Sequence, residues 1–177
     1  TGAPANFPAD PDPWARFVDA APYVRRAALA ALPGMPWSSD TIAAALRGAI
    51  TDPETRAAAL AALRRCPAHW FPLLPEVVAA LQDPDARGTA AHLIAEMGRS
   101  AASAAPALVA AIGAPRPAAN RPAYDEMADV VLDPLDDGGL RVCSWRDSRA
   151  CAARALGEIG VAVDPAPLLP ALDAPSD

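Results

Sequence analysis

Lysine is absent from the sequence, and aromatic residues and long apolar runs are scarce. All 15 basic residues are arginines, against 21 acidic residues, so the 177-residue chain has a formal charge of −6. This balance argues against nucleic-acid binding, which typically needs a basic patch. No stretch approaches the ~20 consecutive apolar residues of a membrane-spanning helix. We therefore expect neither a nucleic acid nor a membrane as a partner.

Cysteine is also scarce and irregularly spaced. Cys66, Cys143 and Cys151 are an odd number and form no Cys-x-x-Cys pair, which argues against a disulfide framework or a thiolate zinc site. We expect no metal or other cofactor, and a cytoplasmic location. The chain begins with Thr1 rather than Met, which leaves open whether it is part of a longer polypeptide.

What the sequence does contain is alanine, 46 residues of 177, arranged in an internal repeat. An arginine recurs at Arg25, Arg56, Arg87 and Arg149, with equal steps between the first three and a step of twice that length before the last. Seven residues after each arginine stands Leu32, Leu63, Ile94 or Leu156, and ten residues after it stands Met35, Cys66, Met97 or Ile159. Positions three, seven and ten after the arginine share one helical face, so each segment is predicted to be an amphipathic helix.

A second helix is predicted in each repeat. Ile50, Leu81 and Ile112 occupy one common position, late in their repeats, and end apolar runs with helical spacing. Asp52-Pro53 and Asp83-Pro84 precede the first helices, where an aspartate suits the N-cap and proline the first turn. The sequence therefore predicts an all-α protein, an α-solenoid of helix pairs with a period of about 31 residues.

The repeat resembles the HEAT-repeat family, in particular the short HEAT-like repeats of the phycobilisome-lyase type. The resemblance is carried by Arg149-Ala150-Cys151-Ala152-Ala153-Arg154-Ala155-Leu156-Gly157-Glu158-Ile159-Gly160 and by the opening Asp52-Pro53-Glu54-Thr55-Arg56, and it covers residues 21–113 and 146–172. It implies a non-enzymatic scaffold or adaptor that binds a protein or peptide on its concave helical face. The alternative is a HEAT-like enzyme or enzyme subunit, similar to a DNA alkyl-base glycosylase or a bilin lyase. The acidic charge and the lack of a catalytic motif disfavour that alternative.

Four segments follow from the repeat. They are a Pro-rich lead with a short capping helix (1–20), three repeats (21–113), a break (114–145), and a last repeat with an acidic tail (146–177). In the break, Ala118 stands where the period predicts an arginine. A degenerate repeat and an insertion both remain open. Within the break we expect a short helix over Tyr124–Leu132 and a turn over Asp133–Gly139.

The repeated arginines are expected to be structural. The set Arg25, Arg56, Arg87, Arg149, Asp52 and Asp83 predicts a ladder of arginine–carboxylate pairs between neighbouring repeats, because the guanidinium fork suits bidentate pairing. Cys66 and Cys151 fall at helical packing positions and are expected to fill the core as small apolar residues.

The candidate binding residues are those that vary between repeats. Positions five and nine after the arginine are expected to face outward and, with two further arginines, to form a mixed-charge concave strip of Arg26, Arg64, Arg65, His92, Glu96, Arg154 and Glu158. The competing interpretation is a solvated face with the i,i+4 pairs His92–Glu96 and Arg154–Glu158. Tyr124, Asp125 and Trp145 are the candidate contacts of the irregular segment. No catalytic residue is predicted.

Overall fold

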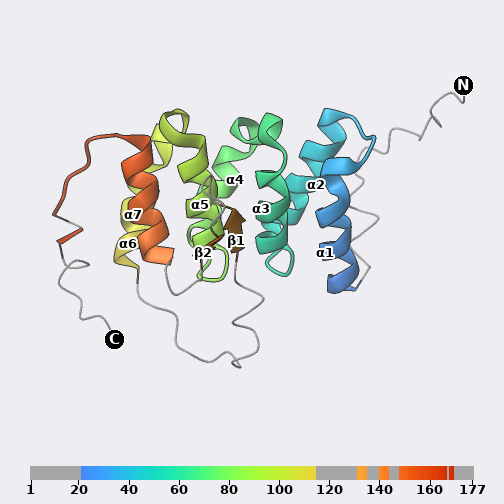
Figure 1. Ribbon diagram of the computed structural model, residues 1–177, viewed down its shortest axis with the longest axis horizontal. Helices are drawn as coiled ribbons and strands as arrows, with labels where there is room; N and C mark the ends of the chain where they lie inside the picture. The colour runs from blue at the N-terminus through green and yellow to red at the C-terminus, as the bar shows by residue number, and fades with distance from the viewer. Residues whose placement is uncertain (1–20, 115–130, 135–139, 144–147, 167, 170–177) are drawn as a thin grey trace, which may run out of the picture. The chain divides into compact units, whose positions relative to one another are not determined.

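The structure is a computed structural model that describes residues 21–114, 131–134, 140–143, 148–166, 168 and 169 (Figure 1). It divides into two units, residues 1–73 and 74–177. The all-α prediction is confirmed in its main part, because the regular structure of the described residues is helical apart from one short pair of strands. No helix among the described residues has both the length and the apolar character needed to cross a membrane.

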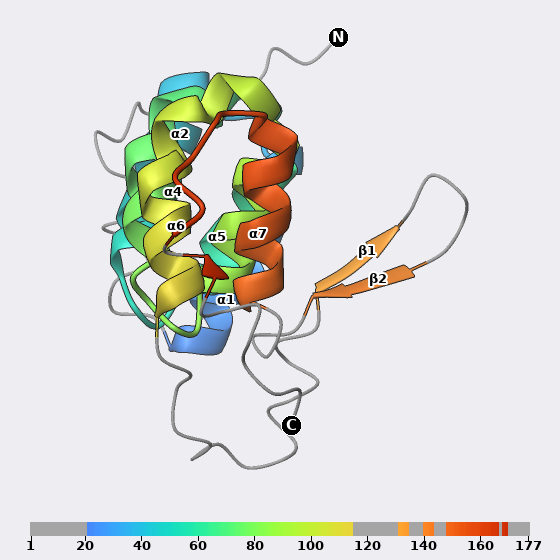
Figure 2. The same cartoon turned by 90° about the vertical axis from the view of Figure 1, so that its left-hand side faces the viewer.

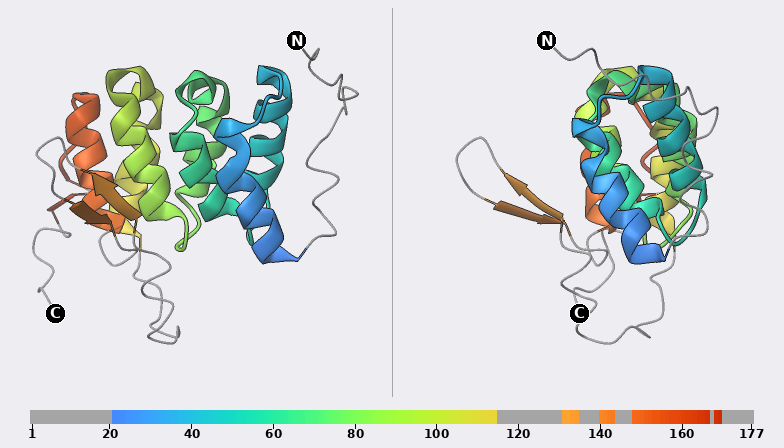
Figure 3. Two further views of the ribbon diagram at one scale, coloured as in Figure 1. Left: turned by 45° about the vertical axis from the view of Figure 1, so that its right-hand side comes forward. Right: turned by 90° about the vertical axis from the view of Figure 1, so that its right-hand side faces the viewer.

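The first unit consists of three α-helices and short 3-10 turns. They are α1 (Pro22–Ala31), η1 (Leu32–Gly34), α2 (Ser39–Thr51), α3 (Arg56–Arg64), η2 (Pro67–His69) and η3 (Phe71–Leu73). Both α1 and α2 pack on α3, with α1 and α3 side by side (Figure 3). Leu32 and Leu63, each seven residues after its arginine, are buried as predicted. Met35, ten residues after Arg25, is exposed, because α1 ends at Ala31 and the backbone at Met35 is extended.

The second unit holds the other helices and the strands. They are α4 (Leu74–Ala80), α5 (Arg87–Met97), η4 (Gly98–Ala104), α6 (Ala105–Gly113), β1 (Val131–Pro134), β2 (Leu140–Cys143) and α7 (Ser148–Ile159). α5 and α7 lie side by side, α6 packs on α7, and α4 packs on α5 (Figure 2). Alanines at the predicted face, Ala90 of α5 and Ala152 of α7, are fully buried. Such small side chains let helices approach closely.

The strands correct one prediction. Val131 pairs with Cys143 and Pro134 with Leu140 in an antiparallel ladder, so the expected helix over Tyr124–Leu132 is wrong at its last two residues. The expected turn over Asp133–Gly139 is likewise wrong at Asp133 and Pro134, which lie in β1. Two short apolar runs on either side of a Gly-Gly sequence, here Gly138-Gly139, are typical of a hairpin, and this signal could have predicted the strands. Residues 124–130 and 135–139 lie outside the described residues.

The aspartates of the Asp-Pro pairs stabilise turns that precede the regular helices. The Asp52 carboxylate accepts from the Glu54 N–H at 3.0 Å, and Asp83 accepts from the Asp85 N–H at 3.0 Å. α3 and α5 begin at Arg56 and Arg87, later than the Asp-Pro pairs suggested. An aspartate that bonds to the backbone two residues ahead stabilises a turn, and this turn places each repeated arginine at its helix start.

Candidate functional site

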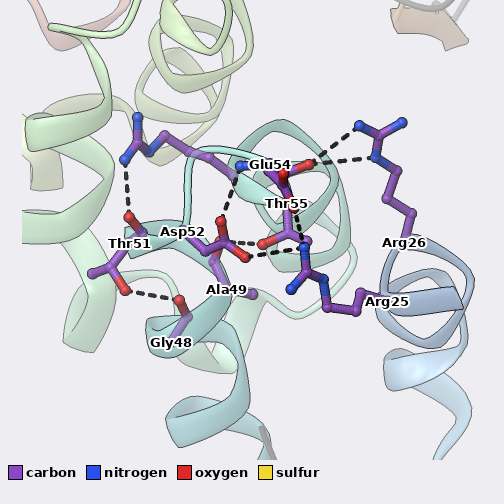
Figure 4. Close-up of polar contacts among 9 residues, drawn as sticks. Arg25, Arg26, Gly48, Ala49, Thr51, Asp52, Glu54 and Thr55 are labelled. Atoms are coloured by element: carbon purple, nitrogen blue, oxygen red, sulfur yellow. Dashed lines mark hydrogen bonds and ion pairs between the residues drawn. The ribbon is translucent and has the colours of Figure 1, made fainter. Parts of the chain in front are cut away.

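Side-chain hydrogen-bond donors cap the C-terminus of α2 (Figure 4). The last four carbonyls of a helix have no partner within it. Here the Thr51 hydroxyl donates to Gly48 O (2.7 Å), the Thr55 hydroxyl to Ala49 O (2.9 Å), Arg56 Nε to Ile50 O (2.8 Å) and Arg56 Nη2 to Thr51 O (3.0 Å). Every orphan carbonyl of this helix end therefore has a side-chain donor.

The contact of the repeated arginine recurs in the second unit. Arg87 Nε donates to Leu81 O at 2.9 Å, and Arg149 Nε donates to Ile112 O at 2.8 Å. These accepting residues, like Ile50 in the first unit, occupy the common late position of their repeats. Each arginine therefore caps the C-terminal end of the second helix that precedes it in the sequence. The partner that these arginines share is a backbone carbonyl.

A pairing of the predicted ladder type occurs at Arg25. Its Nη2 lies 3.7 Å from Asp52 Oδ2, and it also forms an ion pair with Glu54, which the sequence interpretation missed. Glu54 stands in the same Asp-Pro turn, two residues after Asp52, and that proximity was the available signal. The Asp83 carboxylate accepts from the Asp85 N–H. Arg56, Arg87 and Arg149 each donate from Nε to a carbonyl at a helix end, where carbonyls lack intrahelical donors.

Four residues of the predicted strip come together where α5 packs on α7. His92 Nδ1 lies 3.5 Å from Arg154 Nη1, His92 Nε2 lies 3.4 Å from Glu96 Oε1, and Arg154 Nε lies 3.8 Å from Glu158 Oε1. A guanidinium can only donate, so Nδ1 is the acceptor in the contact with Arg154, and Nε2 faces the Glu96 carboxylate. The i,i+4 pairs of the competing interpretation are therefore present, and Arg154 joins them across the two helices.

His92 corrects the prediction of an outward-facing side chain. It is only 3% exposed, whereas the side chains of Arg154 and Glu158 are 37% and 54% exposed. The reason is the packing of α7 on α5, since Arg154 from α7 lies against the imidazole. His92 therefore supports the interface of the two helices and presents little surface to a partner.

The arginines of the first unit lie along α1. Arg26 Nε and Nη2 lie 3.4 and 3.3 Å from Glu54 O, and Arg65 Nη1 donates to Ala30 O at 2.9 Å. Arg26 is itself a residue of α1, and Ala30, the residue that Arg65 contacts, is one helical turn after it. The two arginines are therefore neighbours along α1. Both arginines are exposed, and Arg64 is half-buried in the last turn of α3.

The position nine residues after the repeated arginine is exposed in every repeat. Its occupants are Gly34, Arg65, Glu96 and Glu158. The position five residues after the arginine varies more in its burial, from exposed Ala30 and Ala61 to half-buried Arg154 and buried His92. The ninth position is therefore the outward part of the predicted strip.

Two of the three cysteines, Cys66 and Cys151, have described side chains. Cys151 is buried, and Cys66 is half-buried, so that burial raises the pKa of the Cys66 thiol while the neighbouring Arg65 cation lowers it by a smaller amount. Within the ranges that the structure describes, no group of three or more His, Cys, Asp or Glu side chains could hold a metal ion. Tyr124, Asp125 and Trp145 lie outside these ranges.

Comparison with known proteins provides no relative for this chain. No family model, no curated protein and no solved structure matches it. The resemblance to HEAT repeats therefore stays a prediction based on the motif and its period.

Proposed function

We propose that the chain is a solenoid of HEAT-like helix pairs and serves as a non-enzymatic scaffold that binds a protein or peptide. The observation that carries the proposal is the ninth position after the repeated arginine. It is exposed in all four repeats, yet its occupant changes from glycine to arginine to glutamate. A position that keeps its exposure while its charge changes is suited to recognition, because extended solenoid surfaces bind partners through such side chains.

The framework positions behave in the opposite way. Three residues after the arginine stand Ala59, Ala90 and Ala152 in the last three repeats, and all three are fully buried. The arginine itself closes a helix end at the same Nε atom in each of these repeats. Constant packing beneath a variable surface supports a scaffold, since rigid elements lower the entropic cost of binding.

The ion pair between Arg154 and Glu158 contributes little to folding. An exposed i,i+4 pair such as Arg154–Glu158 stabilises a helix by only about 0.3 kcal/mol. These side chains can therefore exchange their partners when another protein binds. The strip residues are all arginines in the first unit and of both signs in the second, which favours a partner whose charge changes along its length over a uniformly charged polymer.

Site-specific photo-crosslinking tests the proposal. The photoreactive residue p-benzoylphenylalanine would replace Arg65 or Glu158 at the ninth position, and Asp40 of α2 or Ala110 of α6 as matched exposed controls on second helices. Each protein would be irradiated in a lysate of the native host, and adducts would be identified by mass spectrometry. We expect one and the same protein to be cross-linked from Arg65 and Glu158, and not from the controls.

The variant pair Arg65→Glu and Arg154→Glu completes the test. It should abolish capture while the helical circular dichroism remains unchanged. His92 is left intact in this design, because replacing a buried side chain would disturb packing. Adducts formed only from Asp40 and Ala110 would place binding on the second helices and contradict the proposed surface. A complete lack of adducts at all four positions would contradict the scaffold function.

A further inference from the structure

The first unit carries a charge opposite to that of the whole chain. Residues 1–73 have seven arginines and six carboxylates and a net charge of +1, and the described part, residues 21–73, has +3, although the chain as a whole has −6. Two of the carboxylates, Asp52 and Glu54, are engaged by the buried Arg25. The third carboxylate, Asp40, is exposed on α2, whereas the arginines that lie along α1, Arg26 and Arg65, are exposed there.

Arg26 and Arg65 are fixed in place by neutral groups. Their described contacts are with the backbone carbonyls of Glu54 and Ala30. A carbonyl orients a guanidinium without cancelling its charge. Each guanidinium has five N–H donors, and a carbonyl occupies one or two of them, which leaves donors for a carboxylate.

The surface around these arginines is suited to a peptide. Tyr23 is 74% exposed on α1, three residues before Arg26 and thus on the same side of the helix. Ala30 and Ala61 are exposed and short, so they leave room for a backbone to approach. Tyrosine and arginine are the residues most often found as anchors of protein interfaces.

We propose that this surface, Tyr23, Arg26 and Arg65, binds an acidic segment of a partner protein, with carboxylates on the two guanidiniums and apolar contact on Tyr23. The inference rests on the proposed scaffold function and names the chemistry of its partner. Because the guanidiniums are already oriented by carbonyls, binding loses less side-chain entropy than it would at mobile arginines. The attraction is exposed to solvent, so it weakens with salt.

Fluorescence anisotropy with a defined probe tests this chemistry. The probe is a labelled synthetic peptide rich in Asp, Glu, Ala and Leu, compared with the same peptide in which every Asp and Glu is replaced by Asn or Gln. We expect the acidic peptide to bind and the amide peptide to bind at least about tenfold more weakly. The double variant Arg26→Glu with Arg65→Glu should weaken acidic-peptide binding by about tenfold or more, and Tyr23→Ala by about threefold or more.

The control variant is Arg47→Glu with Arg99→Glu. Both of these arginines are exposed and lie outside the proposed surface, and the charge change is identical. Unchanged affinity in this variant supports the proposal. Equal weakening in both double variants would show a response to net charge and overturn it. Equal binding of the two peptides would also overturn it, as would displacement of the acidic peptide by a single-stranded oligonucleotide at the same salt concentration.

The failure of this inference is separable from failure of the scaffold function. The photo-crosslinks from Glu158 report on the second unit and are formed in a protein that keeps Tyr23, Arg26 and Arg65. If the acidic peptide does not bind while those cross-links persist, the partner chemistry is wrong and the scaffold function stands. If the peptide binds and the cross-links are absent, the first unit is an acidic-peptide site without the proposed strip.

Discussion

The repeated arginines act as C-caps supplied from outside the helix that they close. Nε of Arg56, Arg87 and Arg149 lies 2.8–2.9 Å from a carbonyl at or just beyond the end of a preceding helix. Arg87 is only 6% exposed, so water cannot readily take its place. A cation at a helix C-terminus also interacts favourably with the helix dipole. The shared position therefore requires a charged side-chain donor, which is buried at Arg87 and half-buried at Arg56 and Arg149.

Replacing Arg87 tests how much its hydrogen bond to the carbonyl contributes to stability. We expect Arg87→Met to lower the free energy of unfolding by about 1.5–3 kcal/mol, because it leaves the Leu81 carbonyl without its charged donor. Arg87→Lys should recover only part of the loss, since lysine keeps the charge and lacks a donor at Nε. Urea denaturation measures both, and Arg99→Met, at an exposed position, should stay within about 0.5 kcal/mol of the wild type. Full recovery by lysine would show that charge alone is required.

Cys66 should respond to pH in a direction set by its burial. Burial raises the pKa of its thiol, and the Arg65 cation lowers it. In a Cys143→Ser, Cys151→Ala background, we expect Cys66 to react with the thiol reagent DTNB more slowly in the folded protein than in urea at pH 8. Arg65→Gln should slow the reaction further, because the cation that favours the thiolate is lost, whereas Arg47→Gln should not. Faster reaction after Arg65→Gln would contradict this assignment.

The same shift sets the sign of a stability effect. The folded pKa of Cys66 lies above the unfolded one, so the folded state holds the proton more tightly. This contribution is complete below the unfolded pKa and is lost as the pH rises through the folded pKa. Stability should therefore fall in that alkaline range in the wild type and fall less in Cys66→Ala, as followed by urea denaturation at increasing pH.

At the scale of elements, periodicity predicted the helices and their inner faces. Leu32, Leu63, Ile94 and Leu156 are all buried, as their common position predicted. His92 was misplaced because a helical period assigns it a direction but does not reveal that Arg154 from another helix covers it. The strands Val131–Pro134 and Leu140–Cys143 were missed because the helical spacing of Tyr124, Met127 and Val131 competed with the hairpin pattern. Contacts from outside an element decided both cases.

The end of α5 gives a prediction for a single element. Gly98 has φ 57° and ψ −141°, a conformation that side-chain-bearing residues almost never adopt. Gly98→Ala should destabilise the protein by about 1–3 kcal/mol through the backbone alone, because the nearest atom to an added Cβ, Glu158 O, is 4.0 Å away. Gly157→Ala, inside α7 with open space around it, should instead stabilise by about 0.5–1 kcal/mol. Equal effects of the two substitutions in urea denaturation would contradict this account.

At the scale of the chain, the two interpretations of residues 114–145 can be separated. Within the second unit α7 packs directly on α5 and α6. Arg149 contacts Ile112 O as Arg87 contacts Leu81 O, although 37 residues separate the first pair and six the second. The helix after α6 therefore takes the place that the next first helix would occupy. This geometry favours an insertion between neighbouring repeats over a degenerate repeat.

Shortening the connection tests the insertion. In the first unit, Ile50 and Arg56 are joined by Thr51-Asp52-Pro53-Glu54-Thr55, and this sequence would replace residues 113–148 between Ile112 and Arg149. If the segment is an insertion, the shortened chain should fold with α7 in place and gain stability, since each doubling of loop length costs about 0.6 kcal/mol. Urea denaturation would measure the gain, and protection of Cys151 from DTNB would report that α7 remains packed. Exposure of Cys151 with loss of cooperative unfolding is the outcome that a degenerate repeat predicts, because the deletion would then remove part of the core on which α7 depends.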